Sequence, residues 1–222
     1  MKQLLFGTLA SALLFTACKK SKDDNTAPAD KFMSTSAGST WNYAYVDNNN
    51  AANNYDYTRT STTTDTSINA KSYHKYSLST GGSEYYAISG SDYYTYAALP
   101  AQLGGTNVEN LYLKDNAPAG TNWSQVFNID YMSIPLAVTA NNTIAEKGIS
   151  RIVNGTTYNN VIKVTTTLTP PSIPGVTVTT NLTYYYAPKV GLIEDHIVAH
   201  IEGLGAPTDV DTKTTLTSAN IL

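Results

Sequence analysis

The chain has 222 residues, of which 14% are charged, and its formal net charge is −3. No basic patch is present that could hold phosphates, so we expect no nucleic-acid partner. Tyrosine is abundant, at 17 residues against 4 phenylalanines, and it occurs among many Thr, Ser and Asn residues. Since Thr and Tyr favour strands while Asn, Gly and Ser favour turns, the composition predicts an all-β fold.

The first element is a secretory signal peptide. Lys2 supplies a positive charge, residues 4–15 are apolar or small, and Cys18, the single cysteine of the chain, follows closely. An apolar run of about a dozen residues is too short to span a bilayer, which needs ~20. The position of Cys18 is typical of bacterial lipoproteins, so we expect residues 1–17 to be removed and Cys18 to be acylated. Two acyl chains such as palmitate would then anchor the protein stably to the membrane.

A flexible tether is expected after the signal peptide, over residues 18–35 including the lipidated cysteine. Residues 19–31 are polar and charged and contain no large apolar side chain, so they cannot offset the entropy of becoming ordered. Lys22-Asp23-Asp24 resembles the export signal that sends some Gram-negative lipoproteins to the outer face of the outer membrane. We expect a lipid anchor in the outer membrane with the domain facing the cell surface. A periplasm-facing anchor is the alternative.

Residues 36–222 are predicted to form one domain with roughly 11–12 strands, since alternating segments follow one another with turn residues between them. Short turns imply antiparallel pairing, and therefore a curved antiparallel sheet, a sandwich or an open barrel. The expected strand segments, thirteen if 134–140 and 143–153 are counted separately, are 41–45, 55–68, 72–79, 84–89, 93–99, 107–114, 123–130, 134–140, 143–153, 158–168, 176–186, 192–201 and 210–217.

Two local patterns give the strongest positional predictions. Asn154-Gly155 is the clearest hairpin signal, because a type I′ turn needs positive φ at both central residues. Asn141-Asn142 is interpreted as a bend between two strands. In the strand after the hairpin, Ile162, Val164 and Leu168 share one face, and the polar Lys163, Thr165 and Thr167 share the other.

Two short motifs resemble a family of uncharacterised outer-membrane lipoproteins. The stretch from Gly38 to Tyr43, GSTWNY, resembles the G-x-x-W-x-Y opening of these proteins, and the stretch from Tyr184 to Ile193 resembles their YYAxxVGLI tail. The resemblance implies a curved antiparallel sheet or open barrel, distantly like lipocalins or periplasmic lipid carriers. It therefore also implies an alternative function, as a carrier of an apolar ligand.

The tyrosines of neighbouring strands are the best indication of function. Tyr86, Tyr94 and Tyr96 come from adjacent predicted strands, and antiparallel pairing could bring them onto one exposed face. A tyrosine ring with its hydroxyl suits carbohydrate stacking or a protein interface. We interpret the protein as a non-enzymatic binding module for a glycan or a protein. The alternative is that tyrosine merely fills the sheet as a strand former.

Catalytic and metal sites are not indicated. His196 and His200 share one face of a strand, but four residues of strand separate them by ~13 Å, too far to share one ion. No G-x-S-x-G motif is present, and His74 is most simply a strand residue. A Ser-His-Asp triad is recognised by geometry and stays open, so a hydrolase is the least favoured alternative. We expect no cofactor.

Overall fold

The computed structural model describes residues 30–98, 107–131, 134–203 and 208–222. Cys18, the signal peptide and most of the expected tether lie outside these residues.

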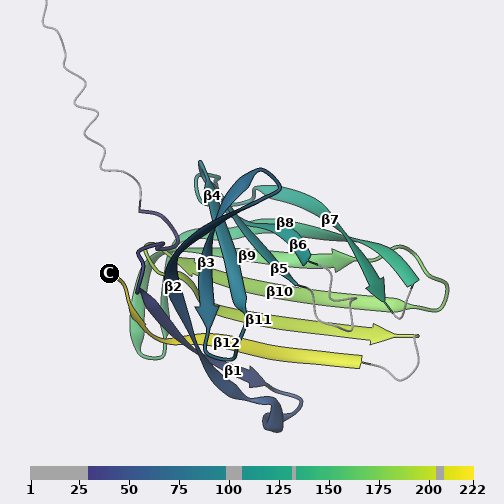
Figure 1. Cartoon of the computed structure of the whole chain (residues 1–222). Coiled ribbons are helices and arrows are strands. Elements are labelled where there is room, and N and C mark those ends of the chain that lie inside the picture. Colours follow the sequence, from purple (N-terminus) through teal and green to yellow (C-terminus); the bar gives the residue numbers. More distant parts are fainter. Residues whose placement is uncertain (1–29, 99–106, 132–133, 204–207) are drawn as a thin grey trace, which may run out of the picture.

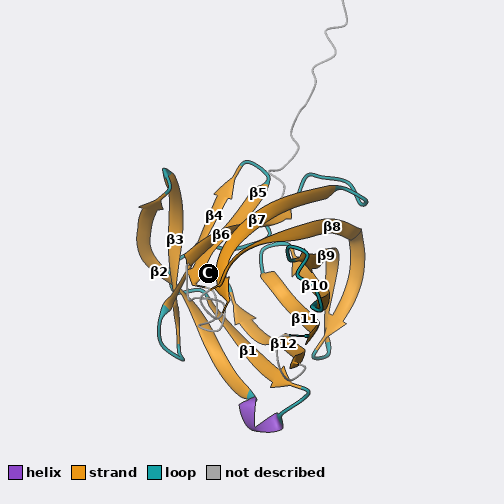
Figure 2. Cartoon of the chain, turned by 90° about the vertical axis from the view of Figure 1, so that its right-hand side faces the viewer, coloured by secondary structure: helices purple, strands orange, loops and turns teal. Residues whose placement is uncertain are grey.

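The domain is one antiparallel sheet of twelve strands, which confirms the all-β prediction. The sheet curls until it is nearly closed into a barrel, with strands β1 to β6 following one another from the centre to one edge and β12 to β7 to the other (Figures 1 and 2). The strands are β1 (Thr40–Asp47), β2 (Tyr55–Ile68), β3 (Lys71–Leu78), β4 (Ser83–Ser89), β5 (Asp92–Ala98), β6 (Asn107–Lys114), β7 (Asn122–Tyr131), β8 (Ile134–Val153), β9 (Thr156–Thr169), β10 (Thr177–Ala187), β11 (Gly191–Glu202) and β12 (Thr208–Asn220), with one short 3₁₀ helix, η1 (Ala51–Asn53).

The two edge strands, β6 and β7, meet along a seam that side chains hold together. Trp123 Nε1 donates a hydrogen bond to the Leu111 carbonyl oxygen at 2.9 Å, and the Leu111 N–H donates to Gln125 Oε1 at 3.1 Å. No backbone ladder joins β6 to β7 in the described residues. The barrel is therefore closed at this seam by two side chains of β7.

Strand β8 runs unbroken from Ile134 to Val153, so the expected bend at Asn141-Asn142 is wrong. Asn142 pairs with Trp123 of β7 on one side and with Thr166 of β9 on the other. Its buried side-chain oxygen accepts a hydrogen bond from Thr166 Oγ1 at 2.7 Å. Because a cross-strand partner satisfies the amide, the strand continues through a residue that usually favours turns.

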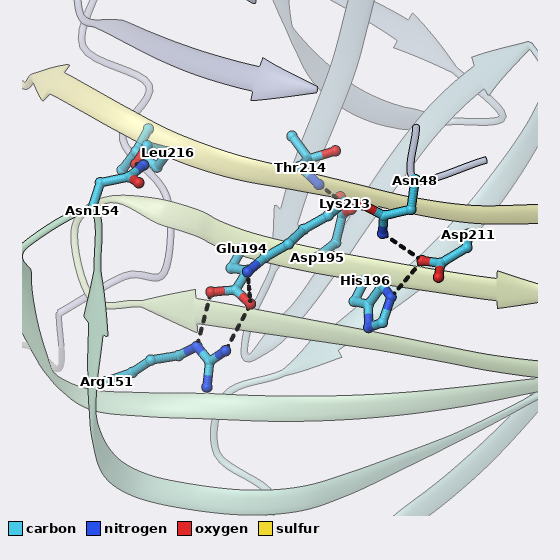
Figure 3. Close-up of polar contacts among 10 residues, drawn as sticks. All are labelled: Asn48, Arg151, Asn154, Glu194, Asp195, His196, Asp211, Lys213, Thr214 and Leu216. Atoms are coloured by element: carbon cyan, nitrogen blue, oxygen red, sulfur yellow. Dashed lines mark hydrogen bonds and ion pairs between the residues drawn. The ribbon is translucent and has the colours of Figure 1, made fainter. Parts of the chain in front are cut away.

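The Asn154-Gly155 hairpin is confirmed. Strands β8 and β9 are joined by these two residues, with φ of 47° and 79°. The Asn154 side chain donates to the Leu216 carbonyl at 2.7 Å, which ties the turn to β12 (Figure 3). Of the apolar residues expected to share one face of β9, Ile162 and Val164 are buried and Leu168 is half-buried.

The chain before β1 covers one end of the barrel, and the ordered domain begins earlier than residue 36. Phe32 and Met33 are each only 8% exposed and belong to the hydrophobic core. The Phe32 N–H donates to the Tyr93 hydroxyl at 3.1 Å. The expected tether therefore cannot extend to residue 35, because two apolar residues inside that range are anchored in the domain.

The two family-like motifs meet at this covered end. Trp41 Nε1 donates to the Val190 carbonyl at 2.8 Å, and the Tyr43 hydroxyl donates to the Leu192 carbonyl at 2.9 Å. Gly191, between these acceptors, has φ of +91°, and a Cβ there would come within 3.2 Å of the Phe32 carbonyl oxygen. Both motifs therefore serve packing at the covered end.

Candidate functional site

A cavity of about 380 Å³ lies inside the barrel. This volume is within the usual range of ligand pockets, ~300–1,000 Å³. Its wall draws on both halves of the sheet, and at one end it is formed by Ala97, Ala98 and Val108, which border residues 99–106 in the sequence. Most of the lining is apolar or aromatic: Met33, Trp41, Tyr76, Tyr86, Ala97, Ala98, Val108, Tyr112, Phe127, Ala140, Leu168, Leu182, Tyr184, Tyr186, Val190 and Leu192.

The aromatic part of this wall is a connected set of rings. Tyr76 packs edge-on against Trp41 at 5.7 Å and against Tyr86 at 5.3 Å between ring centroids. Tyr112 continues the set to Tyr86 at 6.0 Å and to Tyr186 at 5.2 Å. Such contacts between rings fix their orientation, so this part of the wall is preformed.

These tyrosines present neutral hydroxyls to the interior. Burial raises the pKa of Tyr86, Tyr112 and Tyr186 well above the ordinary value, because a phenolate is poorly solvated there. The tyrosine part of the wall therefore carries no charge at physiological pH.

Arg59 is the one charged side chain among the residues that line the cavity. Its Nε donates to Glu84 Oε2 at 2.7 Å, and its Nη1 donates to the Tyr43 hydroxyl at 3.2 Å. The guanidinium carbon lies 5.1 Å from the ring centroid of Tyr43 and 5.0 Å from that of Tyr86. Burial opposes the charged form, but Glu84 and the neighbouring tyrosines outweigh it and raise the pKa of Arg59 well above its usual value. Arg59 is therefore a permanent cation, paired with one carboxylate.

Asp195 of β11 is a buried carboxylate. It is 8% exposed and lies opposite Tyr184, a cavity-lining residue, in the register of β10 and β11. Its Oδ1 accepts the Thr214 N–H at 3.1 Å (Figure 3). Burial raises the pKa of Asp195 to about 6. The preceding residue, Glu194, contacts different partners: Arg151 Nη2 at 2.7 Å and Lys213 Nζ at 3.2 Å.

The three tyrosines proposed from the sequence do not lie together. Tyr86 lies opposite Thr95, and both line the cavity. Tyr94 lies opposite Ala87 and Tyr96 opposite Tyr85, so these two project from the other face of the sheet. No single surface can therefore use Tyr86 together with Tyr94 and Tyr96.

Tyr94 and Tyr96 instead belong to a cluster on the outer face of β3, β5 and β6. Lys71 Nζ lies 3.1 Å from the ring centroid of Tyr94, and the Tyr96 ring lies 6.1 Å from that of the fully buried Tyr73. The Tyr73 hydroxyl and Lys71 Nζ both bond to Glu109. We call these five residues the outer tyrosine cluster.

His196 and His200 each pair with a different aspartate of β12. His196 Nε2 lies 2.8 Å from Asp211 Oδ1, which also accepts from Asn48 (Figure 3), and His200 Nδ1 lies 2.6 Å from Asp209 Oδ1. This is the charge pairing expected of a polar strand face. Among the described residues, no three His, Cys, Asp or Glu side chains form a group that could hold a metal ion.

Ser61, His74 and Asp65 form a chain of hydrogen bonds that the sequence analysis missed. Ser61 Oγ lies 2.8 Å from His74 Nε2, and His74 Nδ1 lies 2.7 Å from Asp65 Oδ1. The order is that of a serine-hydrolase triad. The two-residue turn at Asn69-Ala70 places Asp65 opposite His74, and an irregularity between Ser61 and Asp65 brings the serine into reach. The pairing of Asp65 with His74 could have been predicted from the two-residue turn between their strands. The irregularity between Ser61 and Asp65, in contrast, has no signal in the sequence.

In the described residues, the surroundings of Ser61 do not suit a hydrolytic nucleophile. Ser61 is 2% exposed, and its hydroxyl also lies 3.2 Å from the Thr35 carbonyl oxygen, which competes with His74 for its proton. The Ser61 N–H is bonded to the Ser39 carbonyl at 2.9 Å, so it cannot stabilise an oxyanion. Neither Ser61 nor His74 lines the cavity. The arrangement can fix the segment before β1 onto the barrel, but it offers a substrate no access.

Comparisons with known proteins add one structural likeness. No protein-family model and no curated protein matches the chain. Among solved structures, it is similar to a candidate lipoprotein from Parabacteroides distasonis, with 12% sequence identity and a TM-score of 0.49 over 87% of this chain and 100% of that chain. A similarity at this level identifies no ligand and no reaction. Within the residues that the structure describes, no helix is long and apolar enough to cross a membrane.

Proposed function

We propose that this protein is a membrane-anchored, non-enzymatic lipoprotein whose barrel binds a small, mainly apolar ligand in its cavity. The observation that carries the proposal is the cavity of about 380 Å³ with its largely apolar and aromatic wall. A preformed apolar pocket with few polar groups is the usual form of a small-molecule site. The aromatic wall is part of the core, which explains why tyrosine exceeds phenylalanine: the hydroxyls can bond within a buried interior.

The anchor is the second part of the proposal. The signal-peptide layout before Cys18 supports acylation at that residue, and Lys22-Asp23-Asp24 supports placement in the outer membrane facing the cell surface. Residues 19–29 would then link the lipid to the barrel, since the domain is tied down from Phe32 onward. A ligand site held close to a lipid surface suits a molecule that is poorly soluble in water.

A fluorescence titration tests the cavity. The chain from residue 18 onward, carrying Cys18→Ser so that it stays unacylated, is titrated with the apolar probe N-phenyl-1-naphthylamine. We expect saturable enhancement of fluorescence at micromolar probe. Native mass spectrometry of the same protein should show a co-purified small apolar molecule.

A cavity-filling substitution provides the matched control. Ala97 lines the cavity, so Ala97→Phe should weaken probe binding at least tenfold. Ala44 follows the inward-facing Tyr43 and points to the other face of β1, so Ala44→Phe adds the same ring outside the cavity and should leave binding unchanged. Equal binding by the wild type and by Ala97→Phe would refute the cavity as the site.

The outer tyrosine cluster is a second candidate, for a glycan or a protein partner. The observation in its favour is that Tyr94 and Tyr96, each partly exposed, lie together beside the cation Lys71. Aromatic rings beside a polar group suit sugar stacking or a protein interface. Because Tyr86 lies on the opposite face, this candidate uses only two of the three tyrosines proposed from the sequence.

A further inference from the structure

The charges around the cavity limit what the ligand can be, and this inference rests on the proposed function. The charged groups nearest the cavity are the Arg59 guanidinium, which lines it, the partly exposed Glu84 carboxylate paired with Arg59, and the buried Asp195, which lies opposite the lining residue Tyr184. Glu84 contacts Arg59 directly, at 2.7 Å, and it also accepts a hydrogen bond from Tyr86 at 3.1 Å. The single cation of the wall is therefore already neutralised, and the second carboxylate adds a negative charge on the inner face.

Arg59 nevertheless has donor capacity left. A guanidinium has five N–H donors, and the described residues accept from Nε through Glu84 and from Nη1 through Tyr43. No described residue accepts a hydrogen bond from Nη2. In the part of the chain that the structure describes, no fully buried side-chain nitrogen or oxygen is left without a partner, so Nη2 retains accessible surface.

Three of the neutral polar side chains of the lining are already hydrogen-bonded within the protein. Thr166 Oγ1 donates to Asn142 Oδ1 at 2.7 Å, and Asn110 Oδ1 accepts from Gln125 Nε2. Neutral groups of this kind can offer a ligand only an uncharged hydrogen bond, whereas Arg59 is the one charged donor of the lining. Arg59 is thus the place where an incoming polar atom gains a charge-assisted hydrogen bond, which is stronger than a bond between neutral groups.

We propose that the cavity takes an uncharged ligand, an apolar body carrying one hydrogen-bond-accepting oxygen such as an ester or amide carbonyl, with that oxygen bound to Arg59, and that it discriminates against free carboxylates. A neutral oxygen can accept a hydrogen bond from Arg59 Nη2 while Glu84 remains paired with Arg59. A carboxylate would meet the like charges of Glu84 and Asp195 in a poorly solvated interior, where repulsion is stronger than in water.

A matched pair of probes tests this selectivity. The chain from residue 18 with Cys18→Ser is titrated at pH 8 with cis-parinaric acid and with its methyl ester, which differ only in the charge at one end. We expect the ester to bind about tenfold more tightly or better, where tenfold corresponds to ~1.4 kcal/mol. Equal or tighter binding of the acid would overturn the inference. It would also be overturned if neither the acid nor the ester binds while N-phenyl-1-naphthylamine does. If none of the three probes binds, the proposed function itself fails.

The variant Glu84→Gln tests the cause. It removes the competing charge while keeping the shape and an oxygen that can still accept from Arg59, so the preference for the ester should shrink at least threefold or reverse. Asp195→Asn should shift the preference in the same direction. Glu146→Gln is the control, because Glu146 pairs with Lys163 on the solvent side of β8 and is absent from the cavity lining. An unchanged ester preference in folded Glu84→Gln and Asp195→Asn, as judged by circular dichroism, would show that charge exclusion is not the cause.

Discussion

Gln125 of β7 accepts a hydrogen bond from the backbone N–H of Leu111 of β6 at 3.1 Å, and so it takes the place of a carbonyl on a neighbouring strand. The Leu111 carbonyl is in turn bonded by the Trp123 indole at 2.9 Å. The first and last strands of the sheet are thereby joined without a ladder. Since Val108 and Asn110 of β6 and Phe127 of β7 also line the cavity, the seam is one side of the proposed binding site.

Weakening the seam should loosen this part of the barrel first. Gln125→Ala leaves the Leu111 N–H without its partner, and the loss of such a hydrogen bond lowers the free energy of unfolding by about 1–2 kcal/mol. In hydrogen exchange, we expect faster exchange at Leu111, with strands β10 to β12 unaffected. Ser124→Ala removes a neighbouring side chain that, in the described residues, bonds to Asn141 of β8 and to nothing on β6, and it serves as the control. Equal exchange rates at Leu111 in both variants would contradict the role given to Gln125.

The sequence predicted the strands well because alternation and turn chemistry are local. The Asn154-Gly155 turn and the buried face containing Ile162 follow from single segments. The sequence could not show which residues face the inside of the barrel. Tyr86 and Tyr94 lie in similar alternating strands, and only the direction in which the sheet curves places Tyr86 inside and Tyr94 outside. The seam at Gln125 also depends on contacts between strands that share no ladder. Asp195, by contrast, was detectable: it lies at the same parity as Ile193 on an apolar strand face.

Asp195 should make the domain less stable as the pH rises. Its pKa in the folded state, about 6, lies above the ordinary value of 3.8, so the folded state binds the proton more tightly than the unfolded state. Protonation of Asp195 therefore contributes most to the free energy of unfolding below pH 3.8. This contribution is lost as the pH rises through 6, and the total loss is about 3 kcal/mol. The groups near it are the neutral hydroxyls of Tyr43 and Tyr184, with Glu194 and His196 adjacent in sequence.

The variant Asp195→Asn measures this effect. It keeps an oxygen for the Thr214 N–H but cannot ionise, so at pH 8 it should melt at a higher temperature than the wild type. The difference between the two should shrink towards pH 4. Urea denaturation at pH 4, 6 and 8 gives the free energies of unfolding. If the difference in the free energy of unfolding stays constant over this range, the pKa of Asp195 is not raised in the folded protein.

The Ser61–His74–Asp65 arrangement should not hydrolyse esters. Ser61 is buried, and its N–H is bonded to Ser39, so in the described residues the serine is poorly placed to meet a substrate and its own N–H cannot stabilise an oxyanion. We expect the hydrolysis rate of p-nitrophenyl butyrate to be the same with wild type, Ser61→Ala and His74→Gln as with a denatured sample. Ser61→Ala should instead lower the melting temperature, because it removes a link to Thr35. Hydrolysis that is lost on Ser61→Ala would restore the hydrolase alternative.

The outer tyrosine cluster is tested apart from the cavity. The double variant Tyr94→Ala, Tyr96→Ala should abolish any signal on a glycan array while leaving the binding of N-phenyl-1-naphthylamine within twofold of wild type, since neither residue lines the cavity. Tyr55→Ala is a matched control, because Tyr55 is 47% exposed on β2, outside the cluster. Identical array profiles for wild type and the double variant would remove the cluster as a glycan site.

We expect acylation of Cys18 to determine where the barrel is located. Cys18 is the single cysteine of the chain, so metabolic labelling with an alkyne analogue of palmitate reports on this position alone. In a bacterium with lipoprotein processing enzymes, we expect the wild-type protein to be labelled and to sediment with the outer membrane, while Cys18→Ser should be unlabelled and soluble. One acyl chain gives only marginal binding whereas two give stable anchoring, so the loss of sedimentation should be nearly complete.

Exchanging Lys22-Asp23-Asp24 for Ser-Ser-Ser then tests the orientation. If these residues direct export, externally added protease should digest the wild-type barrel in intact cells and leave this variant intact, with both still labelled. A Cys18→Ser protein that remains labelled and membrane-bound would refute the anchor.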